Sequence, residues 1–320
     1  MWPRGAVSPV QAGEIVLVGH HVRRYAKGPG EIIEDPDPIY DRQVRAFGKE
    51  GQRRIAASKV AIVGTGGTGS PTAEQLVRLG VQDLLLIDPD DCEDTNLTRV
   101  YGTFADALRD DPPGKKVELV ARHLRLINPA AHVRTIALNI ADDEAARELR
   151  DRDYIFVCTD DHWGRSVVNQ VAHQYLIPSI NMGVRVAADR GTIHGATGSV
   201  DALRPDVPCL WCKQFLNPRR IAAESLPADD RLRLEREGYV EGLETKQPAV
   251  VSLTTAVAGH AVTLFLQLVT GFMGDGGDVQ RLTWNILDGT VRRGRTPVDE
   301  DCMCGKVRGR GDLAPRPTMS

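Results

Sequence analysis

The stretch KVAIVGTGGTGS, residues 59–70, decides the fold. Its first half is a short apolar run, which is typical of a strand buried in a parallel sheet. Its second half has the spacing G-x-G-x-x-G at Gly64, Gly66 and Gly69, with a further glycine at Gly67. Glycines there permit a tight turn and let backbone amides approach phosphate closely, and the N-terminus of a following helix adds partial positive charge. The stretch therefore predicts a phosphate-binding turn between a strand and a helix.

The segments after this turn alternate between helical and strand patterns. Residues 69–79 and 117–127 carry apolar side chains at helical spacing, and residues 84–87 and 154–157 are short apolar runs. Asn128-Pro129 ends the second helix, because the residue before a proline avoids the helical region. This alternation predicts an α/β fold with a Rossmann-like, mostly parallel sheet flanked by helices.

Polar side chains gather where the predicted strands end. Asp88 lies nineteen residues after Gly69, at the end of the second predicted strand, where a carboxylate can bind ribose hydroxyls. The carboxyl ends of parallel strands meet in one crevice, so several side chains are expected to converge there. They are Asp88, Asp90, Asn96, Arg99, Lys116 and Asp160. Cations beside a carboxylate that can hold Mg²⁺ suit attack on the α-phosphate of a nucleotide.

Four of the six cysteines fall in two close pairs. Cys209 and Cys212 form a C-x-x-C pair, and Cys302 and Cys304 form a C-x-C pair. This spacing is typical of metal binding and not of a secreted disulfide framework. Four thiolates are the ligand set of a tetrahedral Zn²⁺ site, so the pairs predict zinc.

The composition excludes several classes of protein. Hydrophobic residues make up 42% and charged residues 26% of the 320, as in ordinary globular proteins, and the net charge of −3 argues against a nucleic-acid binder. The longest apolar stretch, residues 249–269, contains six polar side chains and predicts a buried helix instead of a membrane span. The N-terminus lacks the apolar core of a signal peptide. We therefore expect a cytoplasmic protein that binds neither membranes nor nucleic acid.

Taken in order, these motifs resemble the MoeB/ThiF/HesA family of ubiquitin-activating-enzyme-like adenylyltransferases. The resemblance covers roughly residues 40–305. It rests on Tyr40-Asp41-Arg42-Gln43, Gly51-Gln52, the glycine turn, Asp88-x-Asp90, Asn96-Leu97-x-Arg99, Lys116, Asn128-Pro129, Thr159-Asp160, Arg165 and the paired cysteines. One departure is Val100, where members often carry glutamine. Another is the C-x-C pair, which is normally C-x-x-C.

The resemblance implies a role for each matching residue. The ATP-binding set would be Gly64, Gly66, Gly67, Gly69, Asp88, Asp90, Asn96, Arg99 and Lys116. Of these, Arg99 and Lys116 would also act in catalysis, and Asp160 would bind Mg²⁺. Arg42 would reach into the ATP site of a partner subunit, so that a homodimer forms the active site. The two cysteine pairs would hold a structural zinc away from the ATP site.

The resemblance also divides the chain. Residues 39–305 would form a ThiF-type adenylation domain that includes a crossover segment at about residues 213–250 and a C-terminal region tied by zinc. Residues 1–38 would be an N-terminal extension, in which residues 14–18 predict a short strand. Residues 306–320, rich in glycine, arginine and proline, predict a disordered tail.

The expected reaction is ATP-dependent adenylation of the C-terminal glycine carboxylate of a small ubiquitin-like or sulfur-carrier protein that ends in Gly-Gly. Pyrophosphate would leave, and the product would serve sulfur transfer or conjugation. Two alternatives stay open. An NAD-dependent oxidoreductase is compatible with the glycine turn alone but gives Arg42, Asn96 and Arg99 no role. A catalytically silent protein that docks a ubiquitin-like partner would not need a complete phosphate site.

No cysteine is expected to form a thioester with the carrier protein. Thioester-forming members of the family carry their acceptor cysteine in the crossover segment, and residues 213–250 contain none. Cys158 ends a predicted buried strand, where a free cysteine behaves as a small hydrophobe. The acidic neighbours of Cys92 raise the pKa of its thiol.

Overall fold

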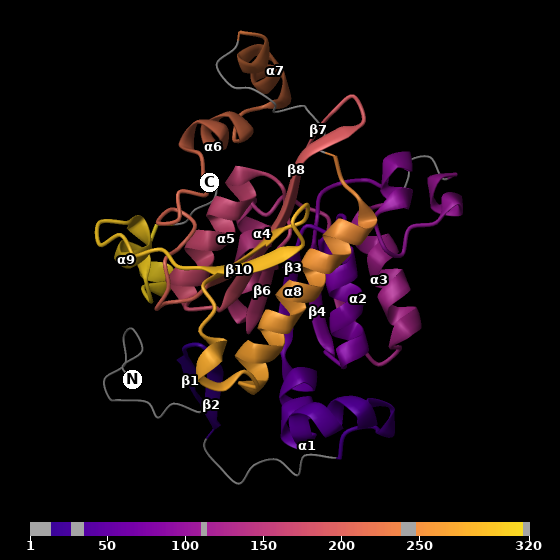
Figure 1. Cartoon of the computed structure of the whole chain (residues 1–320), viewed down its shortest axis with the longest axis vertical. Coiled ribbons are helices and arrows are strands. Elements are labelled where there is room, and N and C mark those ends of the chain that lie inside the picture. Colours follow the sequence, from indigo (N-terminus) through magenta and orange to yellow (C-terminus); the bar gives the residue numbers. More distant parts are fainter. Residues whose placement is uncertain (1–13, 27–34, 110–113, 238–247, 316–320) are drawn as a thin grey trace.

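The computed structural model describes residues 14–26, 35–109, 114–237 and 248–315. One eight-stranded sheet crosses the molecule in the order β10-β9-β8-β7-β6-β3-β4-β5 (Figure 1). Its strands are β3 (Lys59–Val63), β4 (Asp83–Ile87), β5 (His132–Ile136), β6 (Tyr154–Val157), β7 (Ser179–Asp189), β8 (Thr192–Leu203), β9 (Arg281–Asn285) and β10 (Thr290–Gly294). Strands β7, β6, β3, β4 and β5 run parallel, and β8, β9 and β10 continue the sheet antiparallel. The predicted α/β fold with a mostly parallel sheet is confirmed.

Helices cover both faces of this sheet (Figure 1). The α-helices of the described residues are α1 (Asp41–Ala57), α2 (Gly69–Leu79), α3 (Lys116–Ile127), α4 (Asp143–Arg147), α5 (His162–Tyr175), α6 (Pro218–Glu224), α7 (Ala228–Arg236), α8 (Val251–Thr270) and α9 (Met303–Val307). Of these, α6 and α7 lie beyond the end of the sheet (Figure 1). Short 3₁₀ helices lie at Pro38–Tyr40, Asp94–Thr98, Ala105–Leu108, Glu148–Asp151, Gly274–Gly277 and Gly311–Leu313. Both predicted helices form, the second beginning one residue earlier than expected.

The apolar runs of the central strands are continuous because each strand is buried on both faces. Along β3, Val60 and Ile62 pack with α1, α2, α3 and α8, while Ala61 and Val63 pack with α4 and α5. This is the alternation that the pleat of a strand imposes. Two cores therefore lie on opposite faces of one sheet, and the strand ends between them are free to form a site.

Helix α8 is the predicted buried helix. Its length and composition would also allow it to cross a membrane, but 56% of its apolar window is buried inside the fold. It packs against α2 and β7. Phe265 on α8 meets the ring of Tyr154 edge-on, with the ring centroids 5.1 Å apart.

The N-terminal segment forms a hairpin of β1 (Glu14–Val18) and β2 (Val22–Ala26), so the predicted strand at residues 14–18 is present. The hairpin is attached to the main body through Val22, which is buried in the core beside α8, and through an ion pair between Arg24 and Asp153. Residues 1–13 and 27–34 lie outside the described residues.

The C-terminal segment differs from its prediction. Residues 306–315 do not form a disordered tail but pack along α5. Gln174 donates to the carbonyl of Gly311 at 2.7 Å, Gln170 donates to that of Pro315 at 2.7 Å, and Ala314 is buried. Buried amide side chains on α5 thus supply partners that composition alone does not reveal. Residues 316–320 lie outside the described residues.

Candidate active site

A cavity of about 460 Å³ opens at the carboxyl ends of β3, β4 and β6. The chain leaves β3 toward β4 and β5 on one side and later returns to β6 on the other, so the strand order reverses here. Open α/β sheets bind ligands at such points. The predicted residues that line the cavity are Gly64, Gly66, Gly67, Asp88, Asp90, Asn96, Arg99, Lys116 and Asp160. The convergence predicted for the strand ends is therefore present.

Two glycines of the turn allow close backbone contacts that a side chain would prevent. Gly64 has φ +89°, and a Cβ there would lie 2.8 Å from the backbone of Cys158. A Cβ at Gly69, which does not line the cavity, would lie 1.8 Å from the carbonyl oxygen of Gly64. A Cβ at Gly66 would meet nothing within 4 Å. The turn therefore packs tightly against the end of β6 and leaves its backbone open to the cavity at Gly66.

Asp88 fastens this turn to the end of β4. Its Oδ2 accepts from the backbone N–H of Thr65 at 2.6 Å, and its Oδ1 accepts from the N–H of Asp90 at 3.0 Å. Burial raises the pKa of this carboxyl, and the two backbone donors offset part of that rise. The Thr65 hydroxyl also donates to Oδ2 at 3.1 Å, which leaves Oδ1 able to accept one further hydrogen bond, so the group can still bind a hydroxyl in the cavity.

Three polar side chains follow β4 in one short segment. The Lys116 ammonium, at the start of α3, pairs with Asp90 at 2.7 Å and keeps two further donors. Asn96 is buried, and its Oδ1 accepts from the N–H of Glu93 at 2.9 Å. The guanidinium of Arg99 donates to the carbonyl of Thr95 at 2.6 Å. All three have nitrogen donors left for a ligand. Val100, the departure from the family pattern, is buried in the core.

Two aspartates follow β6 and differ in their surroundings. Asp161 caps α5, because its carboxylate accepts from the N–H of Gly164 and from the hydroxyl of Thr159. Asp160 is exposed at the cavity and has no hydrogen bond or ion pair within the described parts of the chain. A free carboxylate at the phosphate turn fits a Mg²⁺ ligand.

Arg165 is one of the residues on which the family resemblance rests, and the sequence assigned it no role. It lines the same cavity. One of its terminal nitrogens donates to the carbonyl of Met182 at 3.5 Å. Its Nε is buried and has no hydrogen-bond partner among the described residues. Burial lowers the pKa of the guanidinium, although Asp161 and Asp160 oppose that change. The guanidinium therefore presents an incompletely paired charge to the cavity.

Two lining residues from the crossover segment have no sequence signal that singles them out. Glu224 on α6 accepts from the N–H of Trp163 at 2.8 Å, and burial raises the pKa of its carboxyl. Arg231 on α7 lines the cavity, and its buried Nε lacks a partner among the described residues. The start of the crossover segment thus covers one side of the cavity. Residues 238–247 of this segment lie outside the described residues.

Arg42 is the predicted site residue that the fold of one chain does not bring to the cavity. It lies exposed near the start of α1 and is not among the lining residues. It forms no hydrogen bond or ion pair with the described residues. The part of the chain that the structure describes therefore gives this guanidinium no partner.

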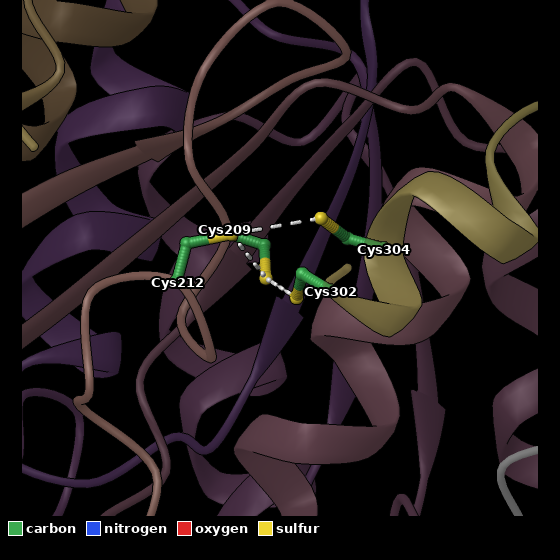
Figure 2. Close-up of side chains that lie close together, drawn as sticks. All are labelled: Cys209, Cys212, Cys302 and Cys304. Carbon is green, nitrogen blue, oxygen red and sulfur yellow. Dashed lines mark hydrogen bonds between the residues drawn. The ribbon is translucent and has the colours of Figure 1, made fainter. Parts of the chain in front are cut away.

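The four paired cysteines come together (Figure 2). All four sulfurs lie within 4.8 Å of one another, and the distances from Cys209 Sγ are 3.7 Å to Cys212 Sγ and 3.6 Å to Cys302 Sγ. The Cys212 and Cys304 sulfurs are 3.8 Å apart. A tetrahedral site with Zn–S bonds of 2.3 Å needs sulfurs about 3.8 Å apart. The shortened C-x-C pair therefore does not prevent a Zn²⁺ geometry.

The loop that carries the first cysteine pair is tied to α5. The backbone N–H of Leu210 donates to the side-chain oxygen of Asn169 at 2.9 Å. Asn169 lies one helical turn after Arg165 on α5, so one face of this helix reaches both the cavity and the cysteine loop. The two residues are four positions apart in the sequence, which is the spacing of neighbours on one helical face.

The two single cysteines are poor nucleophiles. Cys158 is buried behind the glycine turn, and burial raises the pKa of its thiol to about 12. Burial also raises the pKa of Cys92, and the neighbouring carboxylates of Glu93 and Asp94 add to that rise. Both groups therefore remain thiols at neutral pH.

A parallel sheet with a glycine turn after its central strand defines a Rossmann-like α/β protein. The ThiF family model matches residues 40–304, and the chain belongs to that family. The ubiquitin-like modifier-activating enzyme 5 of Drosophila ananassae is 31% identical over an alignment of 198 residues that covers 58% of this chain and 45% of that protein. The SAMP-activating enzyme E1 of Haloferax volcanii is 30% identical over 165 residues, which are 52% of this chain and 56% of that enzyme. The matches thus span about half the length of these relatives.

Solved structures show the same fold. A crystal structure of MccB from E. coli with MccA-N7isoASN has a TM-score of 0.66 at 20% identity and covers 87% of this chain and 77% of MccB. A structure of E. coli MccB with ATP has a TM-score of 0.65 at 21% identity, covering 87% of this chain and 76% of MccB. The likeness thus covers most of this chain.

Proposed function

We propose that this chain adenylates the C-terminal glycine carboxylate of a small ubiquitin-like or sulfur-carrier protein that ends in Gly-Gly. The observation that carries the proposal is the cavity itself. It brings an open glycine turn, the cations Arg99 and Lys116, and the unpaired carboxylate of Asp160 to one place. Two relatives named as activating enzymes for ubiquitin-like modifiers and for SAMP support the class of substrate, and MccB crystallised with ATP supports the nucleotide.

The reaction needs positioning and neutralisation of charge more than covalent chemistry by the protein. A carboxylate oxygen of the carrier attacks the α-phosphorus of ATP, and the bond to the pyrophosphate oxygen breaks. The backbone at Gly66 and the cations Arg99 and Lys116 hold the phosphates and neutralise the charge that develops on them. Asp88 binds the ribose hydroxyls. Asp160 would hold Mg²⁺, which supplies Lewis-acid stabilisation of the phosphate oxygens when bound.

Two further parts complete the proposal. The four cysteines bind a structural Zn²⁺, because their sulfurs lie within 4.8 Å of one another and three of the distances between them, 3.6 to 3.8 Å, match a tetrahedral site. Arg42 acts in the cavity of a second copy of the chain, because its own cavity does not include it. The enzyme is thus a homodimer with composite active sites.

The decisive experiment is carrier-dependent exchange of radioactive pyrophosphate into ATP. The probes are ubiquitin-fold carrier proteins ending in Gly-Gly, each compared with the same carrier lacking the last glycine. We expect exchange with the intact carrier and none with the shortened one. Fluorescence titration with NADH checks the oxidoreductase alternative. Tight NADH binding without exchange would refute the proposal, and carrier binding without pyrophosphate release would favour the silent docking protein.

A further inference from the structure

Phe215 lies behind the cavity and does not line it, yet it contacts a residue that does. The guanidinium carbon of Arg165 lies over its ring at 5.1 Å from the centroid, and that of Arg281 lies over it at 5.9 Å. Cations within about 6 Å of an aromatic face are attracted by the charge distribution of the ring. One ring thus connects a cavity arginine with a second, partly buried arginine on β9.

The ring is fixed by the loop that carries the first cysteine pair. The backbone N–H of Phe215 donates to the carbonyl of Leu210 at 2.9 Å, which closes the loop immediately after Cys212. Gln214 before it has φ +52°, an uncommon conformation for a residue other than glycine. The loop therefore turns sharply to aim the ring of Phe215 toward α5.

The second arginine is held rigidly. Asp201 is fully buried and binds Arg281 through both carboxylate oxygens, at 2.7 and 3.2 Å. Lys213, two residues before Phe215, pairs with the same carboxylate at 3.1 Å and is itself buried. A buried carboxylate with two cations fixes their positions, because separating any of them leaves a charge unpaired in the interior. The ring therefore rests against a fixed group.

Arg165 has little else to hold it. Its one hydrogen bond, to the carbonyl of Met182, is long at 3.5 Å, and its Nε has no partner among the described residues. No carboxylate forms an ion pair with it within the described parts of the chain. The ring of Phe215 is thus a principal contact of this guanidinium. We propose that Phe215 is a positioning residue that holds the Arg165 guanidinium toward the cavity, where it binds the anionic group of a substrate next to Asp160.

The expected effect of Phe215 on catalysis rests on the proposed function, whereas its contact with Arg165 does not. If Phe215 acts through Arg165, its replacement weakens catalysis only while Arg165 is present. A residue that merely fills the core would act independently of Arg165. Phe215 also packs with the core cluster beside α5, so the test must separate the two roles.

The kinetic test is a double-mutant cycle on carrier-dependent exchange. We expect Phe215→Leu to lower kcat/KM about 10-fold. Phe215→Tyr should keep most of the wild-type kcat/KM because it keeps the ring. Arg165→Gln should have a lower kcat/KM than Phe215→Leu. In the Arg165→Gln background, Phe215→Leu should change the rate by less than about twofold. The matched control is Tyr175→Leu, an aromatic of the same core cluster outside the cavity, which should keep the wild-type rate. Effects of Phe215→Leu and Arg165→Gln that simply multiply would overturn the proposal.

A second measurement needs no activity. In protein labelled with ¹⁵N-arginine and free of substrates, the Nε–Hε signal of Arg165 is identified by its loss in Arg165→Lys. Because a nearby ring changes the magnetic field at this group, the signal should move in Phe215→Leu, stay close to its position in Phe215→Tyr, and stay unchanged in Tyr175→Leu. An unmoved signal in Phe215→Leu would refute the positioning role. Wild-type protein that shows the ring effect but no exchange would refute the proposed function alone.

Discussion

Lys116 and Asp160 carry opposite charges at the cavity, and the fold surrounds them differently. The Lys116 side chain is 12% exposed, and its ammonium is already paired with Asp90 at 2.7 Å. Asp160 is exposed and has no partner among the described residues. Pairing with Asp90 fixes the position of the lysine ammonium, while the carboxylate of Asp160, without a partner among the described residues, is available to a cation.

We predict that Lys116→Ala and Asp160→Ala each lower carrier-dependent exchange by at least about 100-fold, the usual effect of removing one charge contact from a transition state. The matched control is Lys115→Ala. Lys115 is the neighbouring lysine, pairs with Asp91 at 2.9 Å and does not line the cavity, so exchange should stay near the wild-type rate. Circular dichroism and thermal melting check that each variant folds. A wild-type rate in either cavity variant would show that its assignment is wrong.

The thiols support a second prediction at the residue scale, that no obligatory thioester forms between enzyme and carrier. A thioester needs an accessible thiolate near the adenylate. The pKa of Cys158 is raised to about 12 by burial, so almost no thiolate exists at neutral pH. Cys92 is buried as well. The four remaining cysteines face one another in the metal-type cluster.

The measurement is intact mass spectrometry and a non-reducing gel after incubation with Mg-ATP and carrier. We expect no enzyme–carrier adduct that a reductant removes. An adduct that disappears in one single-cysteine variant would contradict the prediction and identify the nucleophile.

At the scale of elements, the glycine turn with β3, α2, β4 and β6 could be predicted because each is local. Strand β3 is an apolar run because both its faces are buried, and α2 begins where the glycines end. Strands β7 and β8 lack such a signal. They form a long hairpin whose outer residues, such as Arg185 and Ala187, are exposed, and a register shift follows Ala187. Their pairing depends on residues far apart in the chain, which local periodicity does not report.

The cysteine cluster joins elements that are distant in sequence, and this gives the third prediction. Removing Zn²⁺ with a strong chelator, or replacing Cys302 by serine, should release one zinc per chain. It should also lower Tm, because the metal closes a loop of about ninety residues. A loss of about 2 kcal/mol corresponds to a decrease in Tm of roughly 3 °C for a chain of this size.

Elemental analysis and calorimetry make the measurement for zinc. Cys92→Ser is the matched control, since Cys92 lies outside the cluster, and it should keep the zinc and still lose Tm when the chelator removes the metal. Protein purified without zinc whose Tm does not change in Cys302→Ser would contradict the prediction.

At the scale of the whole molecule, the candidate site could be predicted as a set of residues but not as a set of contacts. The order of motifs predicted which side chains meet at the strand ends, because the carboxyl ends of parallel strands lie at the same edge of the sheet. It did not predict that Asp88 holds the turn through Thr65 or that Arg165 is incompletely paired. Those properties depend on which neighbours reach each group in the fold.

Arg42 raises the remaining question at this scale, because the chain that carries it does not bring it to its own cavity. If a second copy supplies it, the two residues of one active site belong to different chains. Arg42→Ala and Asp160→Ala homodimers would then both be inactive, the first lacking the arginine and the second lacking the carboxylate in every site. A mixed dimer would contain one site with both residues intact and one with neither.

We therefore predict that mixing the two inactive variants restores carrier-dependent exchange. With equal amounts and free subunit exchange, half of the dimers are mixed, and each mixed dimer has one intact site out of two. If each intact site works at the wild-type rate, the total rate should approach about one quarter of the wild-type rate. Subunit exchange is verified by native mass spectrometry of differently tagged copies. The control variant is Arg45→Ala, which should stay active without mixing. Arg45 is an exposed arginine one turn further along α1 and pairs with Asp41. Mixed dimers that form but remain inactive would place Arg42 in cis or outside the reaction, because complementation requires only that the two residues of one site come from different chains.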